Sequence, residues 1–148
     1  MDDYDELLYR ADVLVGELCH PGDDLMLVTG LYGRREAVPP EPSSAQQLVQ
    51  PEAQYWCTVD ATRDTDDDTL WPLHLWVGWR SYAPRALDTV VRLVADGELV
   101  AVIAVVPGRL VAVHPYVGGV DMLFPTAEER AAMRERHATW VSPRADGL

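Results

Sequence analysis

The four histidines are the side chains best suited to proton transfer or metal binding near neutral pH. His20, His74, His114 and His137 form no H-E-x-x-H or comparable ligand motif. His74 and His114 each fall in a run typical of a strand, so they would meet if those strands pair on one face. Such a pair would bind a metal or act as acid and base. The interpretation we favour is structural, with His114 opening the His114-Pro115 corner and His74 as a half-buried strand residue.

The acidic run Asp64–Asp68 resembles the start of a calcium-binding loop. An EF-hand requires glycine at its sixth position and glutamate at its twelfth, where this chain has Thr69 and Leu75. We therefore predict a solvated turn and no metal site. The sequence also contains no G-x-S-x-G, Walker or G-x-G-x-x-G motif, so we predict neither a catalytic residue nor a cofactor.

Aromatic residues offer a stronger candidate for binding. From Trp71 to Arg80, apolar side chains occupy the odd-numbered positions, which we expect to be buried. His74, Trp76 and Arg80 would then share the exposed face. A tryptophan beside an arginine is typical of a binding hot spot. The candidate partner-binding residues are His74, Trp76, Arg80, His114, Tyr116 and Asp121.

The composition limits the classes of partner. The chain has 148 residues, 48% of them hydrophobic, and a net charge of −12 in which every basic residue is arginine. Such a surface repels nucleic acid and steers a basic partner towards the protein, although acidity also serves solubility alone. The N-terminal residues are acidic, unlike those of a signal peptide, and no run of 18 apolar residues occurs. We predict a cytoplasmic protein without a membrane segment.

Hydrophobic periodicity predicts a single α+β domain over residues 1–148. Its sheet is rich in antiparallel pairs and has five or six strands, with three helices packed on it. A proline-rich surface loop at 33–53 includes one helical turn at 44–49. The two cysteines, Cys19 and Cys57, are expected to be buried thiols. The predicted helices are 3–19, 84–95 and 127–140, and the predicted strands are 25–32, 54–62, 71–80, 99–106, 110–116 and 120–124.

Several of these features occur in the same order in a known family. They are Arg10-Ala11 in the first helix, Asp23-Asp24 before the first strand, Tyr116 and Asp121 around a turn, and Trp140 in the last helix. With them the chain resembles the bacterial domain of unknown function family 3885. The resemblance implies an α+β domain and, in some gene contexts, an immunity-like role beside toxins. The turn departs from the family pattern, because its charged part is missing here.

Together these features favour a non-catalytic binding protein, an immunity or accessory protein that holds a basic protein partner. The alternative is a small biosynthetic-cluster enzyme with a cleft that uses His74, His114 or Asp121. A third interpretation is a subunit of a homo-oligomer.

Overall fold

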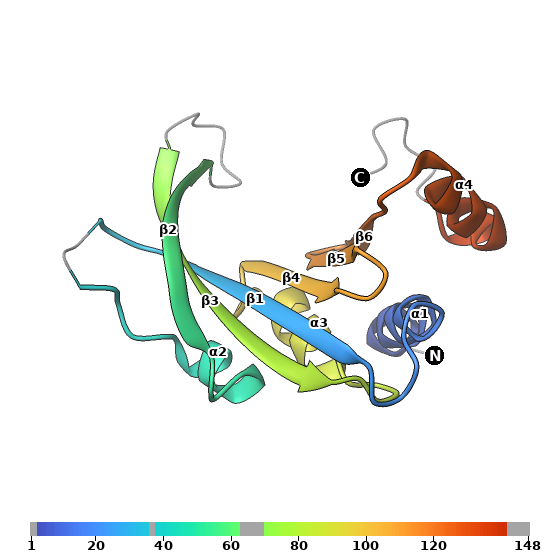
Figure 1. Ribbon diagram of the computed structural model, residues 1–148. Coiled ribbons are helices and arrows are strands. Elements are labelled where there is room, and N and C mark those ends of the chain that lie inside the picture. Colours follow the sequence, from blue (N-terminus) through green and yellow to red (C-terminus); the bar gives the residue numbers. More distant parts are fainter. Residues whose placement is uncertain (1–2, 36–37, 63–69, 142–148) are drawn as a thin grey trace.

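The computed structural model describes residues 3–35, 38–62 and 70–141. Within them the chain forms helices and strands in the order expected for an α+β protein (Figure 1). The helices are α1 (Asp3–Gly16), α2 (Ser44–Val49), α3 (Asp88–Ala95) and α4 (Ala127–Arg136), followed by the 3-10 turn η1 (Ala138–Trp140). The strands are β1 (Asp24–Tyr32), β2 (Gln54–Thr62), β3 (Leu70–Ser81), β4 (Ala101–Val106), β5 (Val111–Tyr116) and β6 (Gly119–Leu123).

The six strands form one antiparallel sheet in the order β2-β3-β1-β4-β5-β6. This confirms the predicted α+β class and the antiparallel hairpin that joins β4 to β5. The β2–β3 register shifts between Tyr55 and Cys57, so Trp56 is an extra residue in a β-bulge. The sheet is curved, and β2 rises at one end of it (Figure 1).

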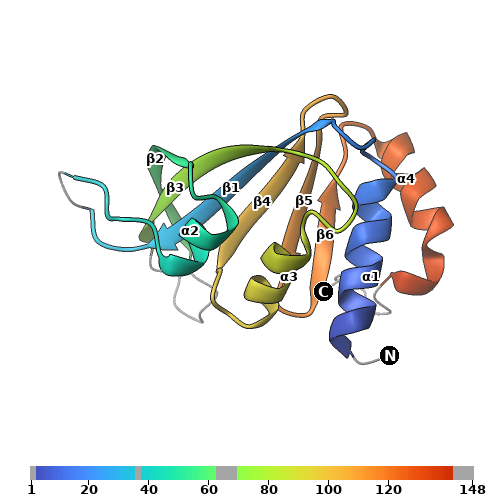
Figure 2. The same cartoon turned by 90° about the horizontal axis from the view of Figure 1, so that it is seen from below.

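Helices α1, α2 and α3 lie on the same side of the sheet (Figure 2). The core forms where the apolar stripes of α1 and α3 meet the inward-facing strand residues, a non-directional burial that drives folding. We call the helix-facing side of the sheet the covered face and the other side the open face. Buried core residues include Leu8, Val15, Leu25, Leu27, Val90, Val94, Val102, Ala104, Val111 and Val113.

The short helix α2 is held to the covered face by polar contacts. Thr29, fully buried in β1, accepts hydrogen bonds at Oγ1 from the amide nitrogens of Gln46, at 2.9 Å, and Gln50. The Gln46 side-chain oxygen also accepts from the backbone N–H of Ser43, at 2.8 Å, within a capping box. The predicted helical turn at 44–49 is therefore confirmed, and Gln46 joins its first turn to the sheet.

Three predicted helix boundaries are wrong, one of them because the helix predicted at 127–140 ends at Arg136 and a separate 3-10 turn follows. Helix α3 begins at Asp88, not at Pro84, because Arg85 takes a left-handed φ of 65° that no α-helix accommodates. Helix α1 ends at Gly16, three residues before the predicted end. At the third predicted helix the Thr126 cap is confirmed, since its hydroxyl accepts from the Glu129 N–H at 3.2 Å.

The C-terminal elements pack beside α1 (Figure 2). The Trp140 ring stacks on His137, with 4.5 Å between ring centroids, and meets the edge of Tyr9 at 6.2 Å. The Arg10 guanidinium lies 5.3 Å from the same indole, a cation–π contact. The late tryptophan thus joins the end of the described chain to the first helix.

Ion pairs from Glu17 support this contact. Its carboxylate accepts from Arg136 Nε at 2.9 Å and lies 2.6 Å from His137 Nε2. Partial burial by itself would raise the pKa of Glu17, but the hydrogen bonds from His137 and Arg136 outweigh burial and lower it. A carboxylate whose pKa falls on folding stabilises the fold above its unfolded pKa. That contribution is lost as pH drops through the folded pKa.

We predict that Glu17→Gln lowers the free energy of unfolding at pH 7 by at most about 1 kcal/mol, because the pair is partly exposed and screened. The difference from wild type should be full above the ordinary pKa of a glutamate and shrink as the pH falls through the lowered pKa of folded Glu17. Urea unfolding followed by far-UV circular dichroism across this range measures it. Glu98→Gln, at an exposed turn, is the matched control; an equal, pH-independent loss in both variants would contradict the assignment.

Candidate functional site

The structure reverses the predicted faces of β3. Trp76 is 2% exposed, whereas Trp79 is 63% exposed. In register, Trp76 lies opposite Thr29 and Trp79 lies opposite Met26, so the two indoles stand on opposite faces of the sheet. The alternation was predicted, but the assignment of Trp76 to the exposed surface is wrong. Its face is the covered one, beneath α2 and the segment that follows β1.

His74 is buried with both ring nitrogens engaged, contrary to its predicted exposure. Nε2 lies 2.9 Å from the carbonyl oxygen of Arg34, so it carries the proton and donates. Nδ1 then accepts from the Thr58 hydroxyl at 2.7 Å, and that hydroxyl accepts from the Tyr55 hydroxyl at 2.6 Å. This chain of bonds fixes the segment after β1 against β2 and β3. The role it supports is structural.

Arg80 shares the covered face with His74 and Trp76, as predicted, but it turns towards main-chain oxygens and is only partly exposed. Its guanidinium donates to the carbonyl of Ala86 at 3.0 Å and to that of Val49, at the end of α2. Burial lowers the pKa of the Arg80 guanidinium from its usual value. No carboxylate of the described residues lies within ion-pair distance, so its charge has no counter-ion there.

The other three predicted residues do come together on the open face. His114 lies opposite Asp121, and Tyr116 opposite Gly119, on neighbouring strands β5 and β6. The rings of His114 and Tyr116 are 5.9 Å apart. Burial, followed by the Asp121 charge, raises the pKa of Tyr116. His74 does not join them, because β1 and β4 separate β3 from β5 and because its side chain lies on the covered face.

The open face is an uncovered surface of the sheet with many apolar side chains. Strand residues there alternate with core residues, and no helix of the described chain lies over them (Figures 1 and 2). Two carboxylates, Asp24 and Asp121, lie on this face, and none of its described strand residues is an arginine. Its exposed and half-buried apolar side chains include Met26, Trp56, Val77, Trp79, Ile103 and Leu123.

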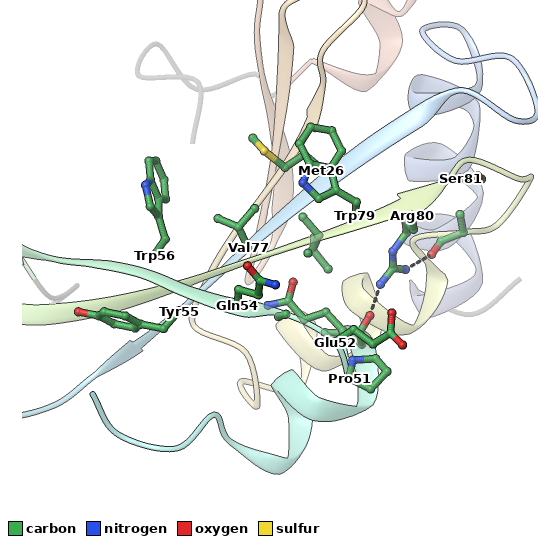
Figure 3. A pocket seen from close by; sticks show the side chains of 16 residues that line it. Met26, Pro51, Glu52, Gln54, Tyr55, Trp56, Val77, Trp79, Arg80 and Ser81 are labelled. Atoms are coloured by element: carbon green, nitrogen blue, oxygen red, sulfur yellow. Dashed lines mark hydrogen bonds between the residues drawn. The ribbon is translucent and has the colours of Figure 1, made fainter. Parts of the chain in front are cut away.

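A pocket of about 920 Å³ opens at one end of this surface, where the segment from α2 to β2 passes the last residues of β3. Figure 3 shows Met26, Trp56 and Trp79 on one side of it, and Arg80 and Glu52 on the other. The volume is in the range that accommodates a small organic ligand. An aromatic wall and a guanidinium therefore line one cavity.

Sequence reasoning missed Trp79 and Trp56 as exposed side chains. Trp79 follows the apolar phase of β3, which suggested burial, and the bulge at Trp56 has no distinctive sequence signal. The number of tryptophans near β2 and β3 was the available signal that some of them would be exposed. Each is 62–63% exposed, which makes them the prominent aromatics of the surface.

Among the described residues no group of three or more His, Cys, Asp or Glu side chains is placed to hold a metal ion. The acidic run Asp64–Asp68 lies within residues 63–69, outside the described residues. No described helix is long and apolar enough to cross a membrane.

We predict that Trp76→Ala lowers the free energy of unfolding by about 3–5 kcal/mol, because it leaves a cavity beneath α2. Trp79→Ala should cost less than about 1 kcal/mol, because this indole is mostly in water. Urea unfolding followed by far-UV circular dichroism compares the two, with Trp56→Ala as a second exposed control. Equal losses for Trp76→Ala and Trp79→Ala would show that the faces are assigned wrongly.

Comparison with known proteins bears on the family and not on the activity. Neither the curated proteins nor the solved structures contain a significant match. Residues 1–145 match the family model described as "Domain of unknown function (DUF3885)". This match covers nearly the whole chain and confirms the resemblance noted in the sequence. The chain therefore belongs to the DUF3885 family.

Proposed function

We propose that this protein is a non-catalytic binding protein whose open face holds a basic protein partner. The observation that carries the proposal is the uncovered side of the sheet, where Trp56, Trp79 and Leu123 are each mostly exposed. Scattered apolar residues are common on protein surfaces, but a contiguous apolar patch is typical of an interaction site. Tryptophan is also enriched among the residues that dominate binding energy.

Charge selects the class of partner. The open face has Asp24 and Asp121 as its strand carboxylates and no arginine among its described strand residues, and the whole chain carries −12. A basic partner with an apolar patch complements both the apolar surface and the negative charge. The electrostatic field of the acidic protein also steers such a partner towards this face. A second copy of this chain would bring a further −12 against it, which disfavours a homo-oligomer through this face. Nucleic acid is repelled for the same reason.

The biological form of this proposal is a bacterial, cytoplasmic immunity or accessory protein. Its acidity and the family resemblance support that form. The competing enzyme would need a cleft with His74, His114 or Asp121. His114 and Asp121 face each other, but His74 is sealed beneath the segment after β1 and already uses both nitrogens.

The test compares open-face variants with equally exposed variants elsewhere. We predict that Trp79→Ser and Leu123→Ser each weaken the partner complex by about 2 kcal/mol or more, because both would lie inside the interface. The partner is captured from a bacterial lysate with the wild-type protein, identified by mass spectrometry and purified. Calorimetry then gives the dissociation constant for each variant.

Leu110→Ser in the β4–β5 hairpin and Leu48→Ser on α2 are the matched controls, since both residues are exposed and lie outside the strands. They should bind as wild type does. Asp121→Asn should weaken binding, and added salt should reduce its effect. A partner that is acidic, or that binds all four serine variants equally, would contradict the proposal.

A further inference from the structure

The last residues of β3 form a sheet edge without a strand neighbour on one side. β2 pairs with β3 only as far as Gln54 opposite Val77, whereas β3 continues to Ser81 in register with β1. Beyond Val77 the segment from α2 to β2 lies beside this edge without pairing to it as a strand. It packs closely at Gly78, where an added Cβ would lie 3.1 Å from Gln50 Oε1. The pocket of about 920 Å³ opens at this edge.

Arg80 brings an uncompensated positive charge into the wall of this pocket. Its two hydrogen bonds, to the carbonyls of Val49 and Ala86, fix the position of the guanidinium and use two of its N–H groups. Neutral carbonyls do not supply a counter-charge, and removing an unpaired charge from water is unfavourable. Remaining N–H groups of the fork are suited to a carboxylate, which guanidinium binds with paired hydrogen bonds.

A second polar group of the wall also lacks a partner. Gln50 is 7% exposed, and its side-chain oxygen is a buried acceptor with no hydrogen bond among the described residues. Its amide nitrogen is already committed to Thr29. This oxygen lies against Gly78 and is itself inaccessible, so only Arg80 offers the wall free hydrogen-bonding groups, and these are donors. Across the pocket the walls are apolar, with Met26, Val77 and Trp79 on the open-face side (Figure 3).

We propose that this pocket binds a carboxylate carried on an apolar or aromatic body. Arg80 pairs with the carboxylate, and Trp79 and Met26 contact the body. The carboxylate belongs either to a small organic acid or to the C-terminus of a polypeptide. The ligand would share Met26 and Trp79 with the open face, but its test uses the protein without the basic partner, so either proposal can fail alone.

The net charge of the protein does not forbid an anionic ligand. At about 0.15 M salt the screening length is about 8 Å, so distant carboxylates contribute little at the pocket. The guanidinium acts at contact distance in a partly desolvated site, where an ion pair is stronger than in water. Glu52 lines the same pocket but is exposed, so its repulsion is damped by solvent. The attraction of Arg80 therefore outweighs the repulsion, and the net electrostatic interaction of the pocket with an anionic ligand is favourable.

The test uses three probes with the same ring, namely phenylacetate, phenylacetamide and phenethylamine, titrated into the full chain. Binding is followed by amide chemical shifts and tryptophan fluorescence. We expect phenylacetate to shift the signals of Trp79 and Arg80 and to bind about tenfold or more tightly than the amide or the amine. Equal binding of phenylacetate and phenylacetamide would overturn the proposal.

Variants then test whether Arg80 is the charged group that recognises the carboxylate. Arg80→Gln should abolish the preference for phenylacetate over phenylacetamide, while Arg109→Gln in the exposed hairpin should leave it unchanged. Glu52→Gln should strengthen phenylacetate binding. Because Arg80 also bonds Val49 and Ala86, circular dichroism must show that its variant is folded. If it does not fold, Trp79→Ala, which removes only the apolar wall, must weaken phenylacetate at least about fivefold for the proposal to stand.

A further pair of probes separates the two sources of the carboxylate. N-acetyl-Leu-Leu-Phe is compared as the free acid and as the C-terminal amide. Tighter binding of the peptide acid than of phenylacetate supports a polypeptide C-terminus, and the reverse supports a small organic acid. If neither acid binds better than its amide, the pocket is not a carboxylate site.

Discussion

The attachment of α2 to the sheet determines which surface of this protein meets solvent. Thr29 in β1 accepts hydrogen bonds from Gln46 and Gln50 of the α2 region, while Arg80 in β3 donates to the last carbonyl of the helix. Removing one partner from such a buried set leaves a polar group unsatisfied, which costs more than the bond contributes. The helix is therefore held on one face. Trp76 lies beneath it, and Trp79 remains in solvent.

This explains what local sequence patterns predict and what they miss. The alternation in β3 identifies a strand and sorts its residues into two groups. It does not say which group faces the helices, because both groups contain large apolar side chains. That choice comes from the pairing of Thr29 with Trp76 and from the polar residues of α2, which are distant in sequence. The same limit applies to His74, whose partners come from before α2 and from β2.

The end of the chain was more predictable because its contacts are local. A hairpin and a short turn place His114 and Asp121 opposite each other on neighbouring strands, so sequence proximity fixes their meeting. The pocket depends instead on where β2 stops and on how the segment before it crosses the edge of β3. No periodic pattern encodes that stop. The type of Arg80 made it a candidate in the sequence, but its surroundings at this pocket could not be predicted.

The acidity of the chain also opposes self-association through the uncovered aromatic face. An exposed sheet face with Trp56 and Trp79 would be expected to associate with copies of itself through the hydrophobic effect. Two copies that each carry −12 repel one another at the approach distance, and Asp24 and Asp121 add carboxylates to the face itself. A basic partner would attract this protein where a second copy repels it, and it would bury the same two indoles, those of Trp56 and Trp79. Under the proposed function, charge and apolar surface together would favour an unlike partner over self-association.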